Sequence, residues 1–150
     1  MAAVDEPKPT RRTNEVGPTG AQVAENLRRV RTARGLSTAR LSKLLTDVGR
    51  PIQPTGITKI EKKERKVDVD DLVALAAALR VNPSALLLPP TTAGEVELTG
   101  VGVVPADIAW RWADGEGPIA MGSDGERYSA VFLDFLLHAR PEGRRDLAVE

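Results

Sequence analysis

Several residue types that carry chemistry are absent or scarce in this chain. The 150 residues include no cysteine, which excludes disulfides, thiol catalysis and cysteine-ligated zinc, and suits a reducing cytoplasm. Histidine occurs once, at His138, so a serine–histidine–aspartate site would depend on that residue, and no nucleophile elbow accompanies it. No apolar run approaches the ~18–20 residues that span a membrane. These absences argue against an enzyme and against a membrane protein.

Two short patterns imitate ligand sites. The run from Gly100 to Pro105 begins like a dinucleotide-binding loop, yet proline stands where the third glycine belongs and no suitable helix follows. The acids Asp68, Asp70 and Asp71 are better explained by the start of a helix, where side-chain oxygens accept backbone N–H bonds, than by a metal site. We therefore expect neither a cofactor nor a metal ion.

The formal net charge of zero conceals two segments of opposite sign. Residues 20–66 contain 12 lysines and arginines and four acids, a net charge of +8, whereas residues 67–150 contain six against 14 acids, a net charge of −8. Clustered positive charge is what a phosphate backbone selects, although a solvated basic face is the ordinary alternative. All five aromatic residues lie outside the basic segment, at Trp110, Trp112, Tyr128, Phe132 and Phe135. Binders of single strands or RNA loops need aromatic platforms among their basic residues, whereas double-stranded DNA read by a helix does not require them.

Local start and stop signals predict a series of five helices. Thr19, with Gln22 three positions later, predicts a capping box at the start of the first helix, and Gly35 marks the end of that helix. Ser37 is the predicted N-cap of the second helix, and residues 47–51 form the turn that follows it.

The remaining three helices have equally local signals. Pro54 suits the first position of a short third helix, where a missing N–H costs nothing. Asp68 is the predicted N-cap of the fourth helix, and Asn82-Pro83 starts the fifth. Apolar residues recur at helical spacing and supply the predicted core: Val23, Leu27, Val30, Leu41, Leu44, Leu45, Ile57, Ile60, Leu72, Leu75, Ala76 and Leu79. The sequence therefore predicts an all-α domain over residues 19–90.

The segments that flank this domain are less regular. Residues 1–18 are polar and contain proline and glycine, so we expect a disordered arm. After Pro89-Pro90, residues 91–150 predict a small mixed α/β or helical segment: a strand or hairpin over 95–104, a short helix over 105–113, a loop over 115–125 and a helix over 127–139. The last helix has an apolar face formed by Tyr128, Val131, Phe132, Phe135 and Leu136. Such a face is buried either against a second copy, which makes the chain a homodimer, or against Trp110 and Trp112.

Over residues 23–88 the order of these segments resembles the Cro/CI-type (XRE-like) helix-turn-helix repressors. The similar positions are Leu27-Arg28-Arg29-Val30-Arg31, Gly35-Leu36-Ser37, Leu41-Ser42, Ile57-Thr58-Lys59-Ile60-Glu61, the run from Leu72 to Leu79, and Val81-Asn82-Pro83. The resemblance covers somewhat under half of the chain. It implies a five-helix, lambda-repressor-like domain whose third helix enters the major groove of DNA, usually within a dimer.

The resemblance also implies which residues contact DNA. The positions at which the family reads base edges are Gln53, Pro54, Thr55, Thr58 and Lys59. The family meets the DNA backbone at the positions of Ser37 and Thr38, and the cations that suit phosphates are Lys62, Lys63, Arg65 and Lys66. Arg31 and Glu61 match family positions at which an ion pair locks the recognition helix to the first helix.

Two departures from the family pattern concern the recognition helix. The connection before it, residues 46–53, is about five residues longer than the family's tight turn, which affects the expected angle of the helix. Glycine is usual just after the position of Glu61, whereas Lys62 and Lys63 stand here, which predicts added charge and an extension of the helix.

These observations favour a cytoplasmic, nucleoid-associated regulator that binds double-stranded DNA sequence-specifically as a homodimer and acts as a repressor. An antitoxin or adaptor that uses the same helical domain for protein contacts is the alternative. An enzyme with residues 91–150 as its catalytic part is disfavoured, because these residues offer no plausible pair of titratable groups.

Overall fold

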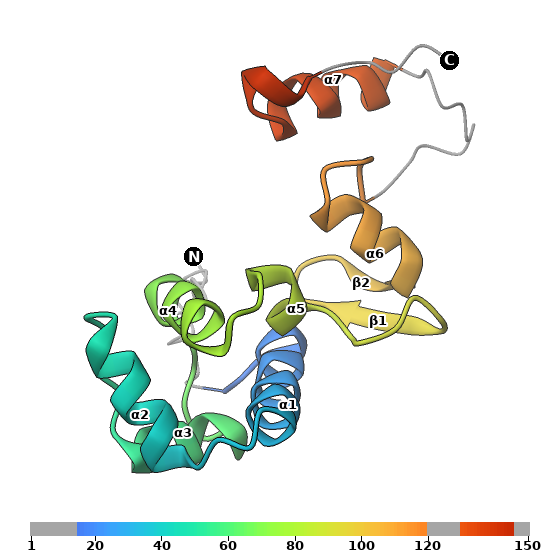
Figure 1. The fold of residues 1–150 in the computed structure, drawn as a ribbon. Coiled ribbons are helices and arrows are strands. Elements are labelled where there is room, and N and C mark those ends of the chain that lie inside the picture. Colours follow the sequence, from blue (N-terminus) through green and yellow to red (C-terminus); the bar gives the residue numbers. More distant parts are fainter. Residues whose placement is uncertain (1–14, 120–129, 146–150) are drawn as a thin grey trace, which may run out of the picture.

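The chain folds as a group of five helices followed by a hairpin and further helices. The computed structural model describes residues 15–119 and 130–145. The five helices are α1 (Pro18–Ala33), α2 (Thr38–Asp47), α3 (Pro54–Glu61), α4 (Val69–Leu79) and α5 (Pro83–Leu87). After them come β1 (Glu95–Leu98), β2 (Gly102–Pro105), α6 (Ala106–Ala113), α7 (Ala130–Ala139) and the 3-10 turn η1 (Glu142–Arg144). The predicted domain of five helices with a small mixed C-terminal part is thus confirmed (Figure 1).

One apolar core holds the five helices together. Each helix contributes to it, with fully or almost fully buried side chains at Leu27, Leu41, Leu45, Ile57, Ile60, Leu75, Leu79 and Leu86. Burial of one such side chain stabilises the fold by about 1.5–3 kcal/mol. Of the predicted core, Leu44 and Leu72 remain partly exposed. Because α3 has only eight residues, it depends on this packing for its stability.

Most helix starts follow the predicted local signals. The Oγ of Ser37 accepts a hydrogen bond from the backbone N of Arg40 (3.0 Å), and Asp68 with Asp71 forms a capping box at the start of α4. Pro54 and Pro83 occupy the first turns of α3 and α5. These caps satisfy N–H groups that have no partner inside their own helices.

The predicted capping box at Thr19 is wrong. The N-cap is Gly17, two residues before Thr19, so helix α1 begins at Pro18 with an N-cap that offers no side chain. Thr19 instead exchanges hydrogen bonds with Thr99: its Oγ1 accepts from the Thr99 backbone N (2.9 Å), and its backbone N donates to the Thr99 Oγ1 (3.2 Å). The start of α1 is therefore bonded to the end of β1. Most of the arm predicted over residues 1–18 lies outside the described residues.

Helix α3 and the connection before it differ from the prediction. Helix α2 continues to Asp47, so the connection to α3 is residues 48–53, about two or three residues longer than a 3–4-residue turn rather than five. At its other end α3 stops at Glu61 and is not extended. Lys63 takes the left-handed conformation (φ 63°), and its N bonds to the Ile60 carbonyl (3.0 Å) while the Glu64 N bonds to the Lys59 carbonyl (2.9 Å). This backbone pattern closes the helix, as glycine usually does at such a position.

The C-terminal part packs against the end of the five-helix domain. The predicted hairpin forms, with Val96 opposite Val104, and the predicted short helix is α6. A second apolar cluster joins Leu88, Val96, Leu98 and Ala109, and the Trp110 indole donates to the Pro89 carbonyl (2.9 Å). Contacts therefore cross the proline pair that separates the two segments.

The last predicted helix is described from Ala130 to Ala139, as α7. The Arg140 side chain, just after it, donates to the Gly115 carbonyl (2.7 Å), and Leu136 is buried. Tyr128 and the second half of the predicted loop over 115–125 lie outside the described residues. In the part of the chain that the structure describes, no helix has the length and apolar character needed to cross a bilayer.

Candidate nucleic-acid interface

Helix α3 separates its residues into a buried face and an exposed face. Ile57 and Ile60 point into the core with Gly56 beside them, and all three are buried. The residues predicted to read base edges lie on the other side: Gln53, Thr55 and Lys59 are exposed, and Pro54 and Thr58 are half-buried. The Thr58 hydroxyl donates to the Pro54 carbonyl (3.1 Å). Because side chains three or four positions apart share a face of a helix, one face of α3 packs into the core and the other is exposed.

The start of α2 lies beside this exposed face. Thr38 lines a shallow depression of about 430 Å³ together with Pro54, Thr55, Thr58, Lys59 and Lys62. Glu64 is also at its edge. Six of the residues predicted to contact DNA therefore lie on one surface, although they come from two helices and the segment after α3. The other predicted contacts do not line the depression: Ser37, Gln53, Lys63, Arg65 and Lys66.

The predicted Arg31–Glu61 pair forms between α1 and the last residue of α3. Arg31 Nε and Nη2 donate to the two carboxylate oxygens of Glu61 at 2.6 and 3.1 Å, and Nη1 donates to the Leu36 carbonyl at 2.8 Å. The two side chains are only 16% and 9% exposed. The hydrogen bond to Glu61 raises the pKa of Arg31 from its ordinary value, against the opposing effect of burial. A paired, forked contact of this kind fixes the orientation of both side chains.

The four cations predicted to suit phosphates are arranged differently from one another. Lys62 is exposed at the depression, and Lys66 is exposed beyond it. Lys63 Nζ lies 3.3 Å from a carboxylate oxygen of Glu25 on α1. The Arg65 side chain folds back over α3 and passes close to Gly56. A Cβ atom at Gly56 would lie only 2.7 Å from the Arg65 Nη1.

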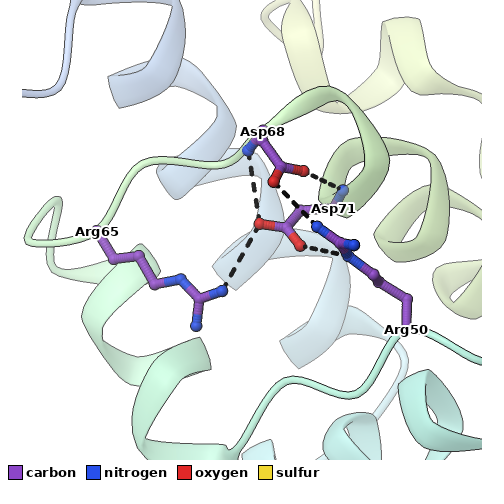
Figure 2. Close-up of polar contacts among 4 residues, drawn as sticks. All are labelled: Arg50, Arg65, Asp68 and Asp71. Atoms are coloured by element: carbon purple, nitrogen blue, oxygen red, sulfur yellow. Dashed lines mark hydrogen bonds and ion pairs between the residues drawn. The ribbon is translucent and has the colours of Figure 1, made fainter.

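Arg65 belongs to a cluster of four charged residues that sequence reasoning missed (Figure 2). Asp71 accepts from Arg50 Nε (3.0 Å) and lies 3.7 Å from Arg65 Nη2, and Arg50 Nη2 donates to Asp68 (2.9 Å). The hydrogen bond to Asp71 and the charge of Asp68 raise the pKa of Arg50. The Asp71 side chain is 5% exposed, whereas the two arginines are 42% and 40% exposed. The signal in the sequence was confined to the N-terminal acids of α4, which were interpreted as helix capping alone.

The residue types that bind metal ions are represented in the described part of the chain by carboxylates and a single histidine, His138. Within residues 15–119 and 130–145, no three histidine or carboxylate side chains gather closely enough to hold a metal ion. His138 is exposed and lies 3.4 Å from Asp134 of its own helix, remote in sequence from the depression.

Comparison with known families assigns this part of the chain. A family model described as "Helix-turn-helix" matches residues 27–86. These residues are a helix-turn-helix DNA-binding domain of the Cro/CI type. The matched segment runs from the middle of α1 to the end of α5 and so contains α2, α3 and the Arg31–Glu61 pair. No curated protein matches the chain.

Three solved structures are similar to about half of the chain. The restriction-modification controller protein C.AhdI from Aeromonas hydrophila is 28% identical over 45% of this chain and 94% of its own, with a TM-score of 0.40. A hypothetical transcription factor, NHTF, from Neisseria is 29% identical over 48% of this chain and 77% of its own, with a TM-score of 0.43. Hydroxypropylphosphonic acid epoxidase from S. wedmorenis is 24% identical over 57% of this chain and 40% of its own, with a TM-score of 0.41.

Proposed function

We propose that this chain is a sequence-specific regulator that inserts α3 into the major groove of double-stranded DNA. The observation that carries the proposal is the convergence of Thr38, Thr55, Thr58, Lys59 and Lys62 on one exposed surface of a helix-turn-helix domain. An α-helix fits the major groove, where each base pair presents a distinct set of donors and acceptors. Exposed polar side chains on such a helix are free to read them.

The surface offers two kinds of contact. Gln53 and Lys59 have the reach for hydrogen bonds to base edges, and the methyl groups of Thr55 and Thr58 suit the thymine methyl. The start of α2, with Ser37 as its N-cap, offers backbone N–H groups to a phosphate, and Lys62 offers a charge. The base contacts give preference for a sequence, and the phosphate contacts give salt-dependent affinity.

We further propose that the chain acts as a homodimer and that residues 91–150 supply the contact between copies. Exposed apolar side chains occur in this part at Val101, Val103, Trp112, Val131, Leu133 and Leu137. Pairing of two copies would present two α3 helices to sites one DNA turn apart, about 34 Å. Occupation of a promoter by such a dimer in the cytoplasm would repress transcription.

Selection from a pool of random duplexes tests the function directly. The full chain should enrich one motif, and the enriched motif should be a two-fold repeat if the dimer is correct. A variant with Thr55→Ala and Lys59→Ala should lose the motif. The matched control is Arg28→Ala, which removes an exposed cation on α1 that is not among the predicted DNA contacts and should keep the motif. A wild-type chain that enriches no sequence would contradict the proposal.

A further inference from the structure

We propose that Asp71 is a positioning residue for DNA recognition: through Arg50 and Arg65 it holds both flanks of α3, so that the lengthened connection still presents the helix in one orientation. The proposal rests on the function proposed above. Asp71 is in the first turn of α4 and is not on the exposed face of α3, so its effect on DNA must pass through other residues.

The N-terminal flank of α3 is held by Arg50. This arginine lies in the connection between α2 and α3, and its guanidinium bonds to Asp71 (3.0 Å) and to Asp68 (2.9 Å). The Ser42 hydroxyl also donates to the Ile52 carbonyl (2.7 Å), and the Ile52 side chain is buried in the core. A connection longer than a tight turn has more conformations available to it, and these contacts select one of them.

The C-terminal flank of α3 is held by Arg65. Its side chain crosses α3 at Gly56, where the absence of a Cβ leaves room for the guanidinium, and its Nη2 lies 3.7 Å from the second oxygen of Asp71. Figure 2 shows Arg50 and Arg65 approaching Asp71 from opposite sides. One carboxylate thus joins the residue four positions before α3 to a residue four positions after it.

Burial explains why Asp71, and not its neighbours, has this role. Asp70 is exposed and Asp68 is mostly exposed, whereas the Asp71 side chain is almost entirely buried. A buried carboxylate with charged partners has a narrow choice of geometry, because moving away from them leaves its charge uncompensated. The same residue also accepts from the Asp68 backbone N (3.5 Å), which ties the cluster to the start of α4.

The decisive measurement is the ratio of affinity for the selected operator to affinity for random duplex. Asp71→Asn keeps the shape and one acceptor oxygen of the side chain but removes the charge. We expect the ratio to fall about tenfold, the order of loss for one misplaced base contact, with the salt slope on random duplex unchanged. Arg50→Gln should lower the ratio in the same direction. It is the cleaner variant, because the Arg50 side chain is partly exposed, unlike that of Asp71, and is not among the predicted DNA contacts. Arg50→Lys should give a value between those of wild type and Arg50→Gln.

A variant that is destabilised at a site remote from α3 tests whether the ratio depends on the orientation of α3 or only on the stability of the fold. Val23→Ala removes part of a buried side chain of α1, far in sequence from α3 and from the four charged residues, and outside the segment proposed to join two copies. At a temperature where all variants are fully folded by circular dichroism, Val23→Ala should keep the wild-type ratio. An unchanged ratio in both Asp71→Asn and Arg50→Gln, or an equal fall in Val23→Ala, would overturn the inference while leaving the proposed function intact. If Asp71→Asn does not fold, Arg50→Gln alone decides. A wild-type chain with no operator preference would overturn the proposed function and this inference with it.

Discussion

Replacement of Glu61 by alanine tests how strongly α3 is anchored to α1. In the native domain the Glu61 carboxylate accepts two bonds from Arg31, and both side chains are largely buried. The substitution leaves the Arg31 Nε and Nη2 groups without partners, while Nη1 keeps its bond to the Leu36 carbonyl. The guanidinium must then remain charged in a mostly buried position or turn away from the domain.

The expected cost follows from this geometry. Removing one partner of a buried ion pair costs about 3–5 kcal/mol, and we expect about 3 kcal/mol because Arg31 keeps one bond and some exposure. For a domain of this size each kcal/mol shifts the melting temperature by about 4–8 °C, so Tm should fall by roughly 12 °C or more. The ordinary pKa of arginine lies far above neutral, so Arg31 cannot relieve the loss in the variant by becoming neutral. In the native domain the hydrogen bond to Glu61 raises the pKa of Arg31 further. A raised pKa stabilises the fold at every pH below the unfolded value, so its contribution is lost only in strong alkali. The arginine therefore adds no pH dependence to Tm between about pH 6 and 9.

Thermal melts followed by circular dichroism measure the effect. The matched control is Glu25→Ala, which breaks the ion pair between Glu25 and Lys63. The Lys63 Nζ lies 3.3 Å from a carboxylate oxygen of Glu25, and the side chains of Lys63 and Glu25 are 46% and 64% exposed. Exposed pairs contribute about 0–1 kcal/mol, so this variant should melt close to wild type. A Glu61→Ala protein that melts within a degree or two of wild type would refute the reasoning, because it would mean that the forked pair has no net anchoring effect.

Three further predictions concern DNA binding, backbone strain and assembly. Lys59→Ala should relax preference at one or two base pairs at a cost of about 1–3 kcal/mol, whereas Lys62→Ala should weaken operator and random duplex alike and reduce the salt slope by about one unit. Competition titrations with operator and random duplex distinguish the two variants. If both variants lose affinity only for the operator, the assignment of Lys59 to bases and Lys62 to phosphates is contradicted. Lys63→Gly and Arg80→Gly each replace a side chain at positive φ (63° and 56°) and should each raise stability in thermal melts by about 0.5–1 kcal/mol, but only Lys63→Gly should weaken DNA binding. A lower Tm in either variant would contradict the prediction that the side chain at that position strains the backbone. Sedimentation of the full chain at tens of micromolar should give a dimer, and a monomer would contradict the proposed assembly.

The elements that the sequence predicts well are those with local causes. Ser37, Pro54 and Asp68 set helix starts through contacts or ring geometry within one turn, and the structure has these starts. Gly35 takes the left-handed conformation just after α1, as a helix-ending glycine does. Thr19 was misleading because Pro18, the better indicator of a first helical position, precedes it.

Contacts between distant segments account for what was missed. Asn26 lies on the inward face of α1 and donates to the carbonyls of Leu86 (2.9 Å) and Leu88 (2.8 Å), more than 50 positions away. Its one sequence signal is a polar residue among inward-facing apolar positions. The contact of Asp71 with Arg50 joins residues 21 positions apart, and no periodicity indicates that this acid is buried. The Arg31–Glu61 pair spans 30 positions and was still predicted, but only through family resemblance.

The eight residues of α3 have two separate roles. Its anchors are Ile57, Ile60 and Glu61, which hold the helix to the domain, and its display residues are the exposed Thr55 and Lys59. A helix this short is not stable alone in water, so its place is set by neighbours: the core around Ile57 and Ile60, and the Glu61 pair. The exposed side chains of Thr55 and Lys59 add little to these contacts, and surface substitutions usually change stability by less than about 0.5 kcal/mol. Exchange of the exposed residues should therefore alter which duplex is preferred while the helix keeps its orientation. Loss of an anchor has the opposite consequence, because every display residue moves together when the helix moves. Preference for DNA is thus expected to depend as much on residues that never reach the bases as on those that do.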